Sequence, residues 1–172
     1  DRVHPEDRRR VFSSFIDYCH SGQGIFQGEF RMRHKAGHYI WILSRGKVVH
    51  HAAGGRPTRI VGTHSDITTL KQAERALRDK QIAEAANRTL LEIGLPRRDT
   101  ADVTQLIGHG TRELMLGLLR QAAQAASDDA LRSWIEQLDH EAVMQCFEQH
   151  YGDTTGTDSQ LYPGVQTGLD QL

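Results

Sequence analysis

The spacing of apolar residues along this chain changes twice, and each change predicts a different element. Residues 5–21 carry apolar side chains at helical spacing. The segment opens with Pro5, Glu6 and Asp7, which favour the start of a helix. From residue 26 the spacing becomes two, which predicts strands at 26–33, 38–49 and 58–65. Short connections between them predict an antiparallel meander. We expect the helix to stop at Gly22. The apolar positions behind this interpretation are Val11, Phe15, Tyr18 and Cys19 in the helix and Phe26, Phe30 and Met32 in the first strand.

A connecting helix follows, and its apolar face changes direction. Leu70, Ala73 and Leu77 form one stripe, whereas a new face begins at Ile82 and continues through Leu90. The step between the two faces is about 140° at the helical angle per residue. Two interpretations remain open: a coiled coil leading to an output domain, or one surface helix that packs on two small cores.

The rest of the chain has the pattern of a helical bundle. Apolar residues at helical spacing alternate with breaks at Gly94-Leu95-Pro96 and at Gly108-His109-Gly110, and we expect a loop over Asp153–Ser159. The positions expected to line the helices are Leu114, Met115, Leu118 and Leu119, then Leu131, Trp134, Ile135 and Leu138, then Val143, Phe147 and Tyr151. The predicted class is α+β: a helix and a three-stranded antiparallel half-sheet (1–66), a connecting helix (67–86) and an all-α bundle (87–172).

Charge divides the chain at the same place. Residues 1–80 hold 15 Lys and Arg against 8 Asp and Glu, whereas residues 81–172 hold 6 against 14. The basic charges are spread out rather than clustered with stacking aromatics, so nucleic-acid binding is not indicated. Two oppositely charged halves favour two separate modules.

Three separated motifs give the first half a family resemblance. HPEDR, EFRMRHKAGHYIWILSRG and GGRPTRIVGTHSDIT occur in this order, and residues 2–80 resemble the C-terminal half of a PAS sensor domain with its PAC motif. The resemblance implies a five-stranded sheet over a ligand-sized cavity. Two strands of that sheet, and the short helices that bind the ligand in the family, have no counterpart in this sequence. It also implies that Asp66, Ile67 and Thr68 pass a signal into the next helix. A role of Asp66 as the cap of that helix is the simpler interpretation and is compatible with signal coupling. Trp41 is the candidate ligand contact, although a tryptophan in a strand more often serves packing.

The second half resembles a different family. NRTLLEIGLP, VTQLIGHGTRELM, FEQHYGD and LYPGVQTGLDQL follow the order found in phosphoglycolate phosphatases of the haloacid dehalogenase-like superfamily. Residues 84–172 are similar to the helical cap that selects the substrate. The resemblance implies that the loop with Gly108, Gly110 and Arg112 faces the substrate; a plain interhelical turn is the alternative.

The catalytic aspartates of that family have no match here, because the sequence contains no Asp-x-Asp-Gly-Thr string. We therefore expect no complete catalytic site, and a Mg²⁺-dependent phosphatase reaction only if another chain supplies the core. The favoured function is a signal-sensing or regulatory module. The alternatives are a fragment of a haloacid dehalogenase-like hydrolase and a gene remnant.

The remaining expectations concern surroundings and partners. Cys19 and Cys146 lie one in each half without disulfide or metal-ligand spacing, so we expect a cytoplasmic protein with no metal site or other cofactor. Apolar runs are too short for a membrane span. Because the sequence starts with Asp1, we expect it to be cut from a longer chain. A half-sheet exposes an edge and an apolar face, so we expect self-association, an output domain or the later helices to cover it.

Overall fold

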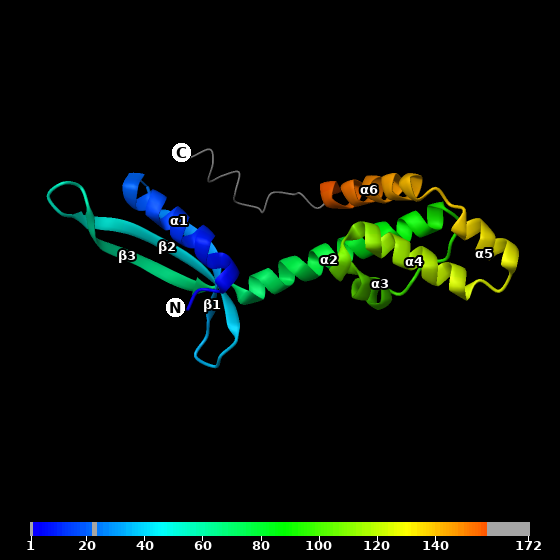
Figure 1. Cartoon of the computed structure of the whole chain (residues 1–172), viewed down its shortest axis with the longest axis horizontal. Coiled ribbons are helices and arrows are strands. Elements are labelled where there is room, and N and C mark those ends of the chain that lie inside the picture. Colours follow the sequence, from blue (N-terminus) through cyan, green and yellow to red (C-terminus); the bar gives the residue numbers. More distant parts are fainter. Residues whose placement is uncertain (1, 22–23, 158–172) are drawn as a thin grey trace. The chain divides into compact units, whose positions relative to one another are not determined.

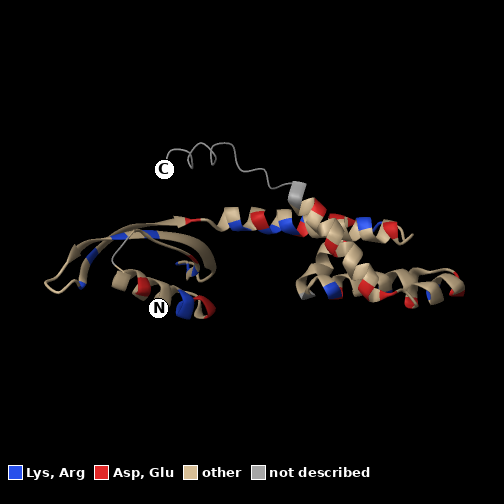
Figure 2. Ribbon diagram, turned by 90° about the horizontal axis from the view of Figure 1, so that it is seen from above, with Lys and Arg blue, Asp and Glu red and all other residues tan. Residues whose placement is uncertain are grey.

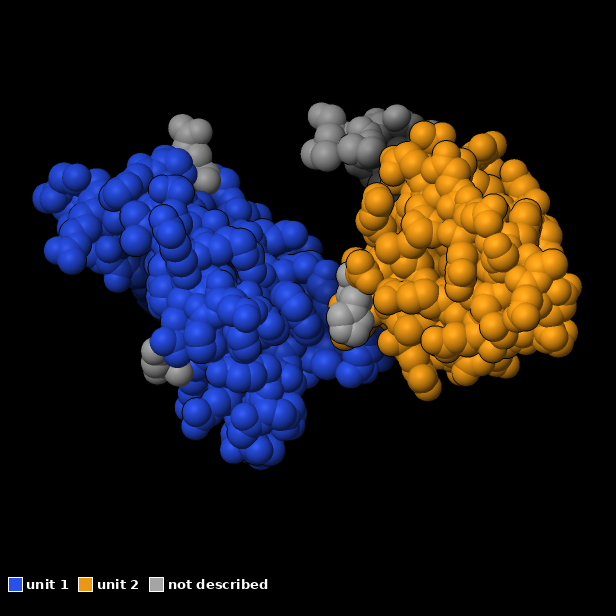
Figure 3. All heavy atoms as spheres, turned by 45° about the vertical axis from the view of Figure 1, so that its right-hand side comes forward, with its two compact units in different colours: residues 1–74 blue, residues 75–172 orange. Residues whose placement is uncertain are grey.

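The computed structural model describes residues 2–21 and 24–157 and divides into two compact units, residues 1–74 and 75–172 (Figure 3). Figure 1 follows the elements along the chain. The first unit holds α1 (Pro5–Ser21), β1 (Phe26–Arg33), β2 (Tyr39–His51), β3 (Pro57–Asp66) and the start of α2 (Thr68–Glu92). The second holds the rest of α2, then α3 (Thr100–Leu106), the 3₁₀ turn η1 (Ile107–His109), α4 (Thr111–Ala125), α5 (Asp129–Glu136) and α6 (His140–Thr157). The α+β class predicted from the sequence is confirmed.

The sheet of the first unit is the predicted antiparallel meander, in the order β1-β2-β3. Phe30 of β1 pairs with Ile42 of β2, which in turn pairs with Asp66 of β3. Gly37 lies in the first hairpin turn with a φ of 95°, a conformation that glycine adopts without a Cβ clash. Alternation predicted the strands and the short connections predicted their order, and both predictions are confirmed.

Helix α1 covers one face of this sheet. Val11 packs on Phe30 and Ile42, and Tyr18 packs on Phe26 while its hydroxyl accepts a hydrogen bond of 2.9 Å from the Val48 backbone N–H. Helix α1 thus covers the apolar side chains of Phe26 and Phe30 in β1. From the sequence we expected the later helices, an output domain or another copy of the chain to cover this face. Strand β3 stays exposed along nearly its whole length.

One continuous helix crosses the boundary between the two units. Helix α2 begins at Thr68 and ends at Glu92, where Gly94 has a φ of 79° and the Leu95 N–H donates to the Leu90 carbonyl at 2.7 Å. The break predicted at Gly94-Leu95-Pro96 is confirmed, and its hydrogen bonds are those of a Schellman motif. Leu77 is half exposed, but Leu90 is buried, so the change of apolar face along the helix is real.

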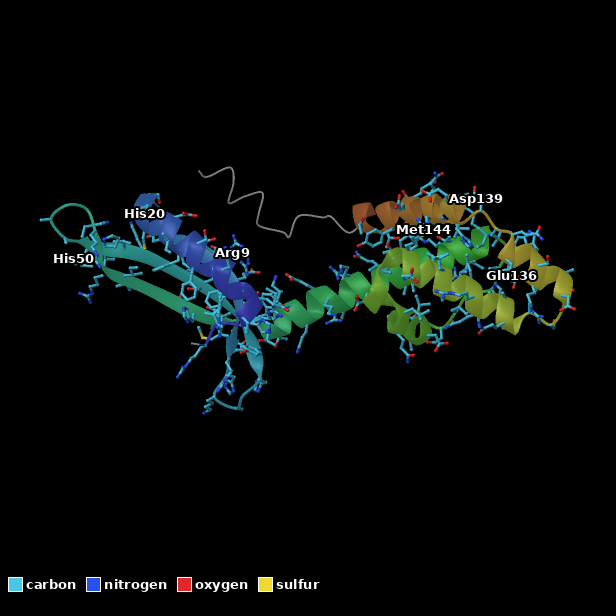
Figure 4. The ribbon with its side chains drawn as sticks, in the orientation of Figure 1. Arg9, His20, His50, Glu136, Asp139 and Met144 are labelled. Carbon is cyan, nitrogen blue, oxygen red and sulfur yellow. The ribbon has the colours of Figure 1, made fainter. Side chains whose placement is uncertain are left out.

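The second unit is a helical bundle with its own core. Leu114 and Leu118 of α4 pack with Phe147 of α6, and Met144 adds to the same cluster from the side of α6 that faces the other helices (Figure 4). The apolar faces predicted for α4 and α6 are confirmed. All the elements described in residues 75–157 are helical.

Two predictions in this unit are wrong. Leu131 and Trp134 of α5 are 41% and 44% exposed, because a helix of two turns presents only a narrow stripe, here Ile135, to the core. The expected loop from Asp153 is instead helical up to residue 157, and Thr154 is buried there. The Thr154 and Thr155 hydroxyls find partners inside the helix by donating to carbonyls four residues earlier. Residues 158–159 of that loop and the expected stop at Gly22 lie outside the described residues.

Three aspartates mark the starts of helices in this unit. Asp128 caps α5 by accepting a hydrogen bond of 2.7 Å from the Ala130 N–H, and Asp129 is the first residue of α5. Asp139 accepts one of 2.9 Å from the Glu141 N–H at the start of α6. Figure 2 colours the acidic residues of the chain red. Part of the negative charge of this half therefore serves helix capping.

Candidate functional site

The Asp66–Thr68 segment joins the sheet to α2 through a short chain of hydrogen bonds. The Ile67 N–H donates to the Trp41 carbonyl at 2.9 Å, and the Trp41 N–H donates to the Thr68 hydroxyl at 3.0 Å. The Asp66 carboxylate accepts the Thr68 backbone N–H at 2.9 Å. The segment therefore caps α2 and also continues the pairing between β2 and β3 past the last strand residue.

A second link to α2 lies around Trp41. This residue alternates with the buried Ile42, so its ring lies on the face of the sheet that α1 does not cover. The Arg31 guanidinium carbon lies 5.7 Å from the centre of the ring, and the Lys71 Nζ lies 6.0 Å from it. Lys71 of α2 also forms an ion pair of 2.8 Å with Glu29 of β1. The first turns of α2 are thus attached to β1 as well as β2.

The charges at this junction are stable near neutral pH. Hydrogen bonds from the side chain and backbone of Thr68 lower the pKa of Asp66, and a hydrogen bond to Glu29 raises the pKa of Lys71. Both groups therefore stay ionised over the physiological range. The sequence predicted Asp66, Ile67 and Thr68 as the coupling segment, which stays a prediction, and it did not indicate Glu29 and Lys71. Their signal was weak, because a charged residue on an exposed strand face is ordinary.

A groove of about 480 Å³ lies between α1 and the inner face of the sheet. Its lining includes Phe12, Phe30, Ile60 and His64. The His64 and Phe30 rings meet edge to face, with their centres 6.2 Å apart. Trp41 is not one of the residues that line it. The predicted ligand contact therefore lies at the junction with α2, and the apolar groove is formed by other side chains.

The predicted substrate loop of the second unit is a tight connection between η1 and α4. Gly108 lies in η1, and Gly110 has a φ of 95° directly before α4. Arg112 lies 3.6 Å from the Glu141 carboxylate of α6, with both side chains largely exposed. Gly110 also lines a hollow of about 260 Å³, while Gly108 and Arg112 do not. The LYPGV segment, which the resemblance placed after the cap, lies outside the described residues.

A larger hollow of about 710 Å³ lies along α4 and α5. Leu119 and Ile135 line its apolar part, and Glu113, Arg120 and Glu136 contribute charges; Figure 4 labels Glu136 on α5. The sequence pattern did not indicate this hollow. It depends on how two helices separated by a loop pack, which periodicity alone does not specify.

Comparison with known families decides the character of the first unit. Residues 1–64 match the family model described as the PAS fold. The N-terminal unit is PAS-like. The resemblance inferred from the sequence motifs is confirmed, and the junction at Asp66–Thr68 directly follows the matched segment.

Two curated proteins are similar to parts of this chain. The chain is 34% identical over 88 residues to the hybrid signal transduction histidine kinase A of Dictyostelium discoideum, which covers 50% of this chain and 4% of that protein. It is 36% identical over 91 residues to a phosphoglycolate phosphatase of Cupriavidus necator, which covers 53% of this chain and 35% of that enzyme. The chain therefore spans only a small part of these curated relatives.

A solved structure is also similar. A sensory box histidine kinase/response regulator from Burkholderia thailandensis is 36% identical, with a TM-score of 0.42, over 45% of this chain and 58% of that chain. Among the residues that the structure describes, no helix has the length and apolar character needed to cross a membrane.

Proposed function

We propose that this chain is a signalling module in which the PAS-like unit controls the start of α2. The coarse assignment to sensors is supported by the PAS match and by the signalling kinase among the relatives. The observation that carries the finer proposal is the Trp41–Thr68 hydrogen bond of 3.0 Å. Because of this bond, a shift of β2 changes the position of the first residues of α2, and a shift of α2 changes the position of β2.

The route of the signal runs from the groove to α2 through the strands. Ile42 faces the core under α1, and the adjacent Trp41 faces Lys71 on the opposite side of the same strand. A ligand in the groove that shifts β2 also shifts the backbone groups that hold Ile67 and Thr68. The helix responds because its first amide groups have no partners inside the helix and rely on the junction.

The substitution Thr68→Val tests the junction. It keeps the shape of the side chain but removes the hydroxyl that accepts the Trp41 N–H. We expect amide hydrogen exchange in residues 68–74 to rise about tenfold, in line with one lost hydrogen bond of a partly buried group. The matched control is Thr69→Val at the neighbouring exposed threonine, which we expect to leave exchange unchanged. Equal exchange in both variants and the wild-type chain would argue against the junction as a coupling element.

A fragment screen tests the sensing part of the proposal. Small apolar fragments that bind the groove should change exchange in residues 68–74 of the wild-type chain, and Thr68→Val should weaken that response. Fragments that bind the groove but leave α2 unchanged would show that the groove and the helix are uncoupled.

We also propose that two copies of the chain pair through α2. Leu70 and Leu77 are 51% and 52% exposed and lie seven residues apart, the repeat at which two helices meet in a coiled coil. Self-association by this stripe would bring two junctions together. An output domain that covers the same stripe is the competing outcome.

A second candidate function is part of a haloacid dehalogenase-like hydrolase. The observation that favours it is the match to a phosphoglycolate phosphatase, together with a second unit whose described elements are helical. With no Asp-x-Asp-Gly-Thr string in the sequence, we expect no Mg²⁺-dependent turnover of a generic phosphomonoester by this chain. Turnover that disappears on substitution of one aspartate would favour the hydrolase over the signalling module.

A further inference from the structure

Three side chains of different chemistry converge where α2 ends beside α6. Glu92 is the last residue of α2, and Cys146 and His150 lie one turn apart on α6. One ligand atom from each residue lies within 4.8 Å of those from the other two. His150 Nε2 lies 2.8 Å from Glu92 Oε2. Carboxylate, sulfur and imidazole nitrogen thus face one small volume.

The kinds of ligand in this cluster select among metal ions. Zn²⁺ takes cysteine sulfur, histidine nitrogen and carboxylate oxygen, and sites with three protein ligands leave a fourth position open. Mg²⁺ and Ca²⁺ prefer oxygen ligands, of which this cluster supplies one side chain. The thiolate and imidazole therefore favour a softer divalent ion of the zinc type.

The helices hold two of the ligands on one face without strain. Residues four apart on a helix lie above one another, so Cys146 and His150 point the same way. Both are half buried, whereas Glu92 is exposed. The cluster is thus shielded on the side of the bundle and open to an ion arriving from solvent.

The distances need only side-chain adjustment to suit a tetrahedral ion. Bonds of zinc to nitrogen, oxygen and sulfur place the ligand atoms roughly 3.3–3.8 Å apart. The Glu92 and His150 ligand atoms must separate slightly from 2.8 Å, and the Cys146 sulfur already lies within 4.8 Å of both. Because the Glu92 side chain is exposed, its rotation meets little packing resistance.

We propose that Glu92, Cys146 and His150 bind Zn²⁺ in the helical unit. On binding, the Cys146 S–H bond is replaced by a sulfur–zinc bond and the proton goes to solvent, while His150 coordinates as the neutral imidazole through Nε2. The ion then joins the C-terminal end of α2 to α6. The inference does not depend on the signalling proposal. Without metal binding, the same residues would form only a hydrogen bond between the Glu92 and His150 side chains beside a packed cysteine.

Cobalt substitution tests the site directly. The chain of residues 1–172, free of affinity tags and treated with a chelator, is titrated with Co²⁺. We expect one equivalent to bind with a thiolate-to-cobalt charge-transfer band, and Zn²⁺ to displace it. Cys146→Ser should abolish the band, while Glu92→Gln and His150→Gln should weaken binding by at least about tenfold, the lower end of what even indirect partners of a metal contribute.

The chain provides matched controls for two of these substitutions. Cys19→Ser removes the other cysteine, in the first unit, and His140→Gln removes an exposed histidine from the same helix as His150. Both should retain the band and the affinity. Circular dichroism checks that each variant is folded. The absence of a charge-transfer band in the folded wild-type chain, or its loss in Cys19→Ser but not Cys146→Ser, would overturn the proposal.

Discussion

Asp7 in the first turn of α1 accepts three hydrogen bonds from Arg31 of β1. The backbone N–H donates at 2.8 Å, and Nε and Nη2 each donate at 3.0 Å. The Asp7 residue is only 7% exposed, and Glu6 accepts a further bond from Nη2 at 2.8 Å. This planar pairing fastens α1 across the sheet whose apolar face it covers.

Removing the charge of Asp7 should loosen that attachment. Asp7→Asn keeps the size of the side chain but weakens the bonds to the Arg31 guanidinium, and we expect a loss of about 2 kcal/mol in the free energy of unfolding of the first unit. Urea denaturation measures it. Asp17→Asn, at an exposed position of the same helix, is the control and should change stability by less than about 0.5 kcal/mol. Equal stability of the two variants would contradict the assigned role.

The same pair predicts how stability depends on pH. The Arg31 guanidinium holds the pKa of Asp7 below its ordinary value near 3.8. Because the folded pKa lies below the unfolded one, the stabilisation is fully present above pH about 4 and is lost as pH falls through the folded pKa. Denaturation midpoints measured from pH 6 downward should fall more steeply in the wild-type chain than in Asp7→Asn. Parallel curves would show that Asp7 is not the group responsible.

Close strand contact at Gly62 gives a prediction about backbone packing. A Cβ at this position would clash with the Arg45 carbonyl and lie 3.0 Å from the Gly46 Cα on the neighbouring strand. We expect Gly62→Ala to cost about 1–3 kcal/mol, because backbone atoms rather than a flexible side chain must move. Gly108→Ala is the control, since no atom lies within 4 Å of its added Cβ. Thermal unfolding followed by circular dichroism compares the two.

Two leucines of the helical unit were both expected in the core, and the structure buries only one of them. Leu118 is fully buried, whereas Leu131, expected from its spacing to be in the core, is 41% exposed. Leu118→Ala should cost about 2–5 kcal/mol and Leu131→Ala less than about 1 kcal/mol. Chemical denaturation of the second unit measures both. A similar cost for both would mean that another surface covers α5 in solution.

The exposed stripe of α2 predicts the oligomeric state. If two copies pair through Leu70 and Leu77, replacing both with lysine places like charges in the contact and should convert dimers to monomers. Light scattering coupled to size-exclusion chromatography reports the mass. Lys71→Gln is a useful comparison, because it disrupts the bond to Glu29 at the junction without removing the stripe. A wild-type chain that is monomeric at high concentration would refute the pairing.

Much of the secondary structure could be read from the sequence because each element has a distinct period. Alternation marked the three strands, and the Gly-Leu-Pro ending of α2 was recognised from local chemistry alone. Errors arose where the local signal was misleading. The Gly and Thr residues near position 153 suggested a loop, yet Thr154 is buried and α6 continues to Thr157.

The sequence by itself determined the α+β class, the antiparallel order of the strands and the place where the apolar face of α2 changes, because these follow from periods within short segments. Tertiary structure alone decided that α1 covers Phe30 and that Lys71 reaches Glu29. It also decided that the Glu92 carboxylate lies 2.8 Å from Nε2 of His150, 58 residues further along the chain. Contacts of this kind depend on how whole elements pack, which residue spacing within one segment does not encode.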